Sequence, residues 1–365
     1  MKILILSTLK RKVAENEFAS RSRIIYQLAR GLVSRGHEVS LIGTGDSIIE
    51  GVKIIPIIPS GWVDLPPVEN PFIRETATLI QQAKIMLSLQ KDFDIIHNHT
   101  YPDIFPHIVD EQLDIPLVTT LHAVAADYLD DAMGLFHNSH FIALSKAYRN
   151  LLKKTSVHAV VYNGIDTSVY QFKEKKGDYL LWIGRINGSK NEDGTYIDPK
   201  GVGWAIQLAQ KTGTPLKMIG DVLDNEAFAK EVEPYLSNTI EWVSKKVSQQ
   251  SLSKEDVVNY MQNAKALLMT VNQEEPFGLV MAESMSCGTP VIGFNKGAVI
   301  EVVKDGETGF VVDVEEGVDG LARALEKIPS ILPSQCRKRV EDHFSVDVMV
   351  ENYEKIYEEL ICASK

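Results

Sequence analysis

"EEPFGLVMAESMSCGTPVIG", residues 274–293, joins a polar start to an apolar run of helical character and ends in a short strand-like segment. Pro276 suits the first turn of a helix, because its missing N–H would have no partner there. Gly278 leaves the backbone bare, so the free N–H groups of this turn should point outward from a helix end with partial positive charge. Glu275 stands before the helix start, and Glu283 lies about two turns inside. The stretch predicts a helix start that binds an anion or hydroxyls.

Two interpretations of these acids are open. A capping acid before the helix and a surface glutamate within it would be the ordinary structural explanation. However, the neighbours of Glu283 are mainly apolar and a strand-like segment follows, which indicates a largely buried helix. A buried carboxylate needs a partner. The pattern therefore favours two acids that bind one ligand.

Strand-length apolar runs alternate with helix-period segments along the rest of the chain, which is typical of parallel sheets covered on both faces. The series restarts after a polar candidate linker at 170–178. We predict two doubly wound, Rossmann-like α/β domains, 1–168 and 169–345, facing a central cleft, and a C-terminal segment, 346–365, whose helix packs back on the first domain. The predicted strands are 2–7, 38–44, 52–57, 94–99, 116–122, 141–145 and 158–163, then 178–186, 215–221, 239–243, 265–271 and 290–294.

Length and charge limit the classes of function. A chain of 365 residues exceeds the usual size of one compact core. Its formal net charge of -11 argues against a nucleic-acid partner. Lys10, Arg11, Lys12, Arg21 and Arg23 are nevertheless clustered in sequence. They are either a solvated loop and helix face, which is the simpler interpretation, or a dock for an anionic acceptor or a membrane surface.

Three cysteines, Cys287, Cys336 and Cys362, are too few and too scattered for a disulfide framework or a zinc site. The run "MKILILS" at residues 1–7 has no cleavage site and is interpreted as a strand. Apolar runs are all shorter than the ~18 residues that span a bilayer. We expect a cytoplasmic monomer or homodimer; association with the inner face of a membrane is an alternative that nothing specific indicates.

Several phrases along the chain resemble one family in the correct order. They include "LARGLVSRGHEVSLI" (28–42), "WIGRI" (182–186), and the E-x7-E stretch followed by "GAVIEVVKDGETGFVVD" (297–313). Between them, "DIIHNH", "TTLH", "IALSKAYRNLL" and "VVYNGIDTSVY" fall where that family has similar phrases. The sequence thus resembles the retaining family-4 glycosyltransferases of the GT-B fold over nearly its whole length.

The resemblance implies roles for the opening stretch. Glu275, the first acid of E-x7-E, would contact hydroxyls of the donor sugar near the reacting carbon. Glu283, the second, would accept hydrogen bonds from the ribose of the nucleotide. Main-chain N–H groups around Phe277, Gly278 and Leu279 would hold the sugar or the diphosphate.

The resemblance also implies that two cations neutralise the diphosphate as it leaves. Arg185 is the first. The second is a lysine, for which Lys190 has the spacing but Lys200 has the helix context, "KGVGWAIQLA"; we favour Lys200. Two fixed cations and a helix start can stabilise this leaving group without a metal ion. We also place Gly220 and Val247 in the predicted donor site.

In the first domain, His122 matches a family histidine near the sugar, with a satisfied core histidine as the alternative. Ala19 and Ser20 stand where the family usually has a Gly-Gly pair near the donor phosphates and the acceptor, which puts the contacts of that loop in doubt. His97 and His99 share a strand face and could suggest a metal pair, but no acid or cysteine at ligand spacing supports one.

The predicted reaction is metal-independent, retaining transfer of a sugar from a nucleotide-diphosphate donor to an acceptor that the sequence does not identify. UDP-glucose is the first choice of donor, followed by other UDP-sugars or GDP-mannose. No cofactor or metal is expected, and the D-x-D at 92–94 is attributed to chance because it precedes a strand. The alternatives are an epimerase or phosphorylase of the same fold, and a non-catalytic nucleotide-sugar-binding protein. A dehydrogenase is disfavoured because no G-x-G-x-x-G follows either first strand.

Overall fold

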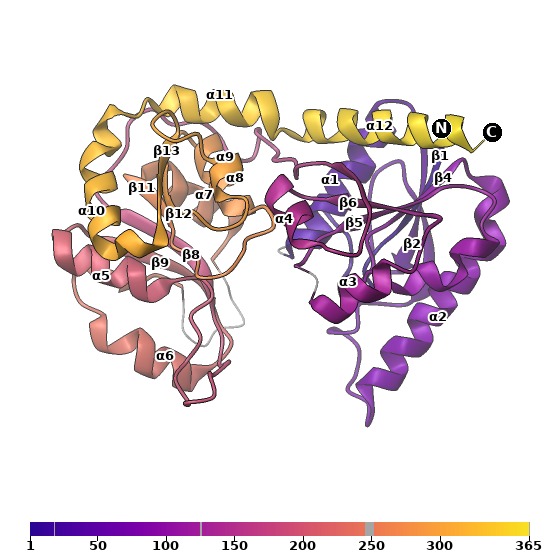
Figure 1. Cartoon of the computed structure of the whole chain (residues 1–365), viewed down its shortest axis with the longest axis horizontal. Helices are drawn as coiled ribbons and strands as arrows, with labels where there is room; N and C mark the ends of the chain where they lie inside the picture. The colour runs from indigo at the N-terminus through magenta and orange to yellow at the C-terminus, as the bar shows by residue number, and fades with distance from the viewer. Residues whose placement is uncertain (18, 125, 245–251, 365) are drawn as a thin grey trace. The chain divides into compact units, whose positions relative to one another are not determined.

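The chain is described by a computed structural model that covers residues 1–365 except residues 18, 125, 245–251 and 365. It consists of two compact units (Figure 1). The first is Met1–Gly164 together with Val346–Lys365, and the second is Ile165–Ser345. The polar stretch 170–178 lies within the second unit, where Tyr170 is buried. Among the helices of the described residues, none combines the length and the apolar character needed to cross a membrane.

The first unit contains a seven-stranded parallel sheet with the order β3-β2-β1-β4-β5-β6-β7. Its inner strand β1 is buried on both faces, from Ile3 to Leu6, because helices cover the sheet on both sides (Figure 1). The elements are β1 Lys2–Leu6, α1 Ser20–Ser34, β2 Glu38–Thr44, β3 Lys53–Ile58, α2 Pro71–Leu89, β4 Ile95–Asn98, β5 Leu117–Leu121, α3 Asp127–Met133, β6 Ser139–Ala143, α4 Lys146–Leu151, β7 Val157–Val160 and α12 Val346–Ala363, with short 3-10 helices at Gln90–Asp92 and Phe105–Gln112.

The last helix of the chain, α12, completes the first unit by packing along α1 (Figure 1). Gly31 of α1 allows the close approach, because a Cβ at this position would lie 2.5 Å from Cγ2 of Val350. The predicted apolar face of α12 is confirmed, and two of its tyrosines also make buried hydrogen bonds. The Tyr353 hydroxyl is 2.7 Å from Oγ1 of Thr120, and the Tyr357 hydroxyl is 2.5 Å from Nδ1 of His97.

The second unit contains a six-stranded parallel sheet with the order β10-β9-β8-β11-β12-β13. Its core includes Trp182, Met218 and Phe294 between the sheet and its helices. The elements are β8 Leu180–Ile186, α5 Val202–Thr212, β9 Leu216–Val222, α6 Asn225–Glu231, β10 Ile240–Trp242, α7 Lys254–Asn263, β11 Ala266–Met269, α8 Leu279–Ser286, β12 Val291–Phe294, α9 Val299–Val302, β13 Gly309–Val312, α10 Gly317–Lys327 and α11 Pro333–His343, with 3-10 helices at Glu233–Tyr235, Val314–Glu316 and Ile328–Ser330.

Every strand-length run predicted from the sequence overlaps an observed strand. The strand β13, which the sequence reasoning missed, pairs with β12 at the edge of the second sheet. It has only four residues, and glycine, its first residue, is uncommon inside strands, so the sequence pattern does not predict it. Gly309 has a φ of 156°.

Candidate functional site

In the second unit, the predicted helix start forms after strand β11. Gly278 has φ 79° and lies immediately before α8, which begins at Leu279. A Cβ at Gly278 would lie 2.5 Å from the Met281 methyl group and 3.3 Å from Cγ of Glu275, so only glycine fits this turn without strain. The structure gives the N–H groups of residues 278–280 no acceptor among the described residues. They are available for a ligand at the positive end of the helix.

Glu275 lies beside this helix start and pairs with Lys200. The ammonium Nζ of Lys200 donates a hydrogen bond to Oε2 of Glu275 at 2.7 Å, and both side chains are largely buried. The backbone of Lys200 is held in turn, since Nε1 of Trp182 donates to its carbonyl oxygen at 3.0 Å. The structure therefore brings together the lysine and the first acid of the predicted donor site.

Two glycines allow neighbouring loops to pack closely against the backbone at and before Glu275. Gly201 has φ 68°, and a Cβ there would lie 1.6 Å from the carbonyl oxygen of Thr270, the residue after β11. Gly297 has φ 56°, and a Cβ there would lie 2.3 Å from the backbone nitrogen of Glu275. The N–H of Gly297 donates to Oε2 of Glu274 at 2.6 Å. The loops after β8 and β12, the strands on either side of β11, thus contact the backbone between β11 and α8 that carries Glu275.

Arg185 and Lys190 occupy different surroundings. Arg185 lies near the end of β8, exposed and without a hydrogen bond or ion pair in the part of the chain described. Its neighbour Gly184 packs under Lys200, because a Cβ at Gly184 would lie 3.2 Å from Cβ of Lys200. Lys190 forms an isolated antiparallel β-bridge with Tyr196 in the loop between β8 and α5, and its Nζ lies 3.9 Å from Oε1 of Glu226. Of the two candidate lysines, the structure places Lys200, and not Lys190, beside Glu275.

Glu283 is buried in the second turn of α8. The hydroxyl of Tyr170 donates a hydrogen bond to its Oε1 at 2.8 Å. Leu279 and Val280, four and three residues earlier on the same helix face, are half-buried. Glu283, the predicted partner of the ribose, thus already has a hydrogen-bond partner within the protein. It lies one turn from the less buried start of this helix.

Three other residues, Phe277, Gly220 and Val247, were also predicted to belong to the donor site. Phe277 directs its ring into the core, where it contacts Phe344 at a centroid distance of 5.7 Å, so its main chain is what it offers a ligand. Gly220 lies within β9, and a Cβ there would lie 1.6 Å from the carbonyl oxygen of Gly184; its lack of a side chain serves strand packing. Val247 lies outside the described residues.

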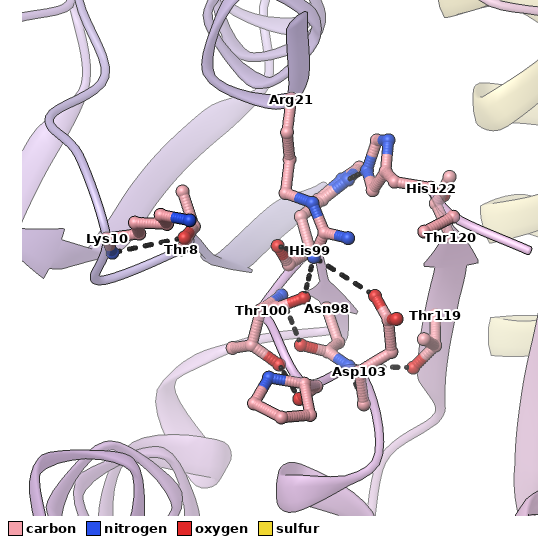
Figure 2. A network of polar contacts seen from close by, with 12 residues as sticks. Thr8, Lys10, Arg21, Asn98, His99, Thr100, Asp103, Thr119, Thr120 and His122 are labelled. Atoms are coloured by element: carbon pink, nitrogen blue, oxygen red, sulfur yellow. Dashed lines mark hydrogen bonds and ion pairs between the residues drawn. The ribbon is translucent and has the colours of Figure 1, made fainter. Parts of the chain in front are cut away.

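In the first unit, His122 follows β5 and meets His99, which follows β4. Figure 2 shows the two rings side by side, with Nδ1 of His99 2.8 Å from Nε2 of His122. The ring of His97 lies against His99 at a centroid distance of 3.9 Å. His97 itself is hydrogen-bonded by both nitrogens, the second 2.8 Å from Thr120. Within the described residues, no group of three or more His, Cys, Asp or Glu side chains could hold a metal ion.

A buried ion pair lies next to these histidines (Figure 2). Nη1 of Arg21 donates to Oδ1 of Asp103 at 3.1 Å, to the carbonyl oxygen of His99 at 3.3 Å and to that of Thr100. Burial raises the pKa of Asp103, and Arg21 opposes this shift. Arg21 therefore does not belong to an exposed basic patch, whereas Lys10, Arg11 and Lys12 are exposed.

Burial also sets the charge of the histidines. It lowers the pKa of His97 and of His107 to about 3. It lowers the pKa of His99 and of His122 well below the usual range, and the nearby Arg21 adds to both shifts. These imidazoles are neutral near pH 7. Their chemistry at this sheet edge is therefore hydrogen bonding.

Ala19 and Ser20, the substitutes for the family's Gly-Gly pair, stand at the start of α1. Ala19 is the cap residue, with an extended backbone and no side-chain hydrogen bond to the helix, and Ser20 is the exposed first residue of α1. Both have negative φ, since every positive φ in the described chain belongs to a glycine. Each side chain therefore fits its backbone without strain.

Four contact residues of these sites were missed by the sequence reasoning. Glu274, Gly297 and Tyr170 had a signal, because all three lie in phrases that resemble the family. The contacts of Asp103 and Tyr170 were not predictable, because their partners, Arg21 and Glu283, are 82 and 113 residues away.

Comparison with known families gives two matches in succession. Residues 22–169 match the family described as Glycosyltransferase Family 4, and residues 209–339 match Glycosyl transferases group 1. Among relatives, the N-acetyl-alpha-D-glucosaminyl L-malate synthase of Bacillus anthracis is 25% identical over 92% of both chains. An alpha-maltose-1-phosphate synthase of Mycobacterium tuberculosis is 23% identical over 76% of this chain and 82% of that protein.

Solved structures resemble the whole chain. Sucrose-phosphate synthase from Thermosynechococcus elongatus aligns with a TM-score of 0.76 at 17% identity, covering 99% of each chain. The Anabaena protein HepE, crystallised with UDP and glucose, aligns with a TM-score of 0.69 at 17% identity, covering 99% of this chain and 100% of that one. At this level of identity the likeness concerns the fold.

Proposed function

Because the chain belongs to the group 1 and family 4 glycosyltransferases and has their GT-B fold, we propose that it is a retaining enzyme that transfers a sugar from a nucleoside diphosphate without a metal ion. The observation that carries this proposal is the pairing of Lys200 with Glu275 beside the start of α8. A cation, an acid and free N–H groups converge there at the carboxyl ends of parallel strands, where open α/β sheets bind ligands.

The chemistry of the leaving group fits these residues. The diphosphate gains negative charge as its bond to the sugar breaks. Lys200, the neighbouring Arg185 and the start of α8 supply positive charge and hydrogen-bond donors for it. Arg185 makes no ion pair in the described chain, so a diphosphate would not have to displace a protein partner from it.

Lys200 and Glu275 satisfy each other at 2.7 Å in this structure. Donor binding exchanges this ion pair for two contacts, because the ammonium turns to the phosphate oxygens and the carboxylate accepts from sugar hydroxyls. For the transfer itself we propose front-face displacement, in which the diphosphate oxygen takes the acceptor proton.

UDP-glucose is the proposed donor, with other UDP-sugars and then GDP-mannose as runners-up. The fold likeness to HepE, which was crystallised with UDP and glucose, supports the uridine nucleotide. The E-P-F-G-L form of the motif at 275–279 also resembles members that use UDP-sugars. His122 remains the predicted residue of the first unit for this reaction.

Donor choice and reaction are tested in two steps. Thermal shifts against a panel of nucleotides and nucleotide sugars should show the largest stabilisation with UDP-glucose or another UDP-sugar, since a specific ligand stabilises the folded state. The selected donor is then incubated with candidate acceptors in the presence of EDTA. Undiminished release of UDP, with a product whose anomeric configuration matches the donor by NMR, is the expected result.

The alternatives give different results in the same experiment. An inverted anomer, or activity lost with EDTA and restored by Mg²⁺ or Mn²⁺, would overturn the proposed mechanism. Conversion of the donor into its epimer without an acceptor, and without net release of nucleoside diphosphate, is expected of an epimerase. Tight donor binding with neither transfer nor slow donor hydrolysis is expected of a binding protein.

A further inference from the structure

His99 and His122 face each other through one ring nitrogen each. Nδ1 of His99 lies 2.8 Å from Nε2 of His122 (Figure 2). At this distance one nitrogen must carry a hydrogen and the other a lone pair. Two arrangements are therefore open. If His99 donates, the proton of a neutral His122 is on Nδ1; if His122 donates, its proton is on Nε2.

The second nitrogen of His99 separates the two arrangements. His99 is fully buried, and its Nε2 has no hydrogen-bond partner in the described part of the chain. If His122 donated, a neutral His99 would have to carry its own proton on this Nε2, as an orphaned buried donor. If His99 donates from Nδ1, Nε2 keeps only a lone pair. Unpaired buried N–H groups are the rarer defect in native proteins.

The charge of Arg21 points the same way. Its Nη1 lies 3.3 Å from the carbonyl oxygen of His99, and Asp103 holds the guanidinium there. A positive charge favours a lone pair over an N–H on a neighbouring group. Arg21 also opposes a second proton on either ring. The buried cation and the orphaned nitrogen thus favour the same proton arrangement.

We propose that His99 is a positioning residue that donates from Nδ1 to Nε2 of His122 and fixes His122 as the neutral tautomer with its proton on Nδ1. His122 is only half-buried, and its Nδ1 has no partner within the described residues. This nitrogen can therefore donate to an oxygen of a ligand, such as a hydroxyl or a phosphate, and cannot act as a base. The identity of the ligand rests on the proposed function, whereas the tautomer does not.

The tautomer can be measured in the full-length protein labelled with ¹⁵N-histidine. Long-range ¹H–¹⁵N correlation spectra distinguish the two neutral tautomers and the charged ring. The wild type should show His122 protonated on Nδ1 and unchanged between pH 6 and 8, with its signals assigned by their loss in His122→Gln. A wild-type His122 that is protonated on Nε2, or charged, would overturn the proposal.

Variants of His99 separate positioning from simple packing. His99→Phe removes the donor, so His122 should move toward the Nε2 tautomer. His99→Asn keeps an N–H near the position of Nδ1 and should preserve the wild-type spectrum. His107→Phe is the matched control, because His107 is equally buried and bonded to Ser139 and Thr119 but does not touch His122. Equal spectra of His122 in the Phe and Asn variants of His99 would also overturn the proposal.

Kinetics add a readout that depends on the proposed function. His99→Phe should lower kcat about tenfold, as expected for one lost oriented hydrogen bond, with nucleotide affinity unchanged and His99→Asn near the wild type. A wild type without transfer activity would refute the proposed function, while the spectra would still decide the tautomer. Should His99→Phe not fold, the wild-type and His99→Asn spectra suffice.

Discussion

The two units place different chemistry at the carboxyl edges of their sheets. In the second unit, Lys200 reaches Glu275 through a single hydrogen bond that a ligand can exchange. In the first unit, Arg21 is bound to a carboxylate and to two backbone carbonyls, so its cation is fixed in place beside neutral histidines. Both edges contain a largely buried ion pair. The number of additional contacts decides whether a pair can serve a ligand or only the fold.

Acid should unfold the first unit at a higher pH than the second. Every histidine except His343 lies in the first unit, and burial lowers the pKa of His97 and His107 to about 3. Below pH ~6.5 the unfolded chain takes up protons that the folded state does not. This contribution to the free energy of unfolding is fully present above pH 6.5 and is lost as the pH falls toward 3, by up to roughly 5 kcal/mol per such histidine. Hydrogen exchange, corrected for intrinsic rates, should show early exposure of β4 and β5. Earlier loss of protection in β11 and β12 would contradict this.

Asp103→Asn should show that the ion pair of the first unit is structural. The substitution leaves the guanidinium of Arg21 buried without a counter-charge, which costs about 3–5 kcal/mol. Chemical denaturation at pH 7 measures the loss. Asp319→Asn is the control, because Asp319 forms an exposed pair with Lys211, and should change stability little. Equal effects of the two substitutions would remove the distinction between the edges.

Lys200→Ala and Glu275→Gln should show the opposite behaviour in the second unit. Each should cut turnover about 10²–10³-fold, in the range for the loss of one preorganised electrostatic contact. The fall in melting temperature should be smaller than for Asp103→Asn, because Lys200 and Glu275 share a single hydrogen bond. Lys190→Ala is the matched lysine control and should retain nearly normal turnover, since Lys190 lies near Glu226 instead. Similar losses for Lys190 and Lys200 would place the diphosphate site elsewhere.

Gly201→Ala and Gly194→Ala test whether the close packing of Gly201 against Thr270 holds the neighbouring Lys200 in place. Their effects on stability and nucleotide binding should be the smallest of those described. Both glycines have positive φ, 68° and 82°, so each substitution carries similar strain, about 1–3 kcal/mol. Only at Gly201 would the new Cβ meet a backbone oxygen, that of Thr270. Gly201→Ala should therefore have the lower melting temperature and the weaker nucleotide binding. Identical melting curves would show that the loop moves freely.

Much of the fold could be predicted because most strands are continuous apolar runs in the sequence. The missed strand, Gly309–Val312, is too short for such a run, because it has four residues and the first is a glycine. The helix start at Gly278 was also predictable, since proline, glycine and the acids lie close together in sequence. The meeting of His99 with His122 was not. It depends on β4 and β5 being neighbours in register, which strand patterns alone do not determine.

The buried hydrogen bonds of α12 have a consequence for the order of synthesis. Tyr353 and Tyr357 close the core of the first unit from residues that a ribosome adds only after the whole second unit has been made. A nascent chain that ends at residue 164 would leave Thr120 and His97 without these partners, facing solvent or a chaperone. The second unit is one contiguous segment and can fold first. The unit that begins the chain is therefore the one that finishes last.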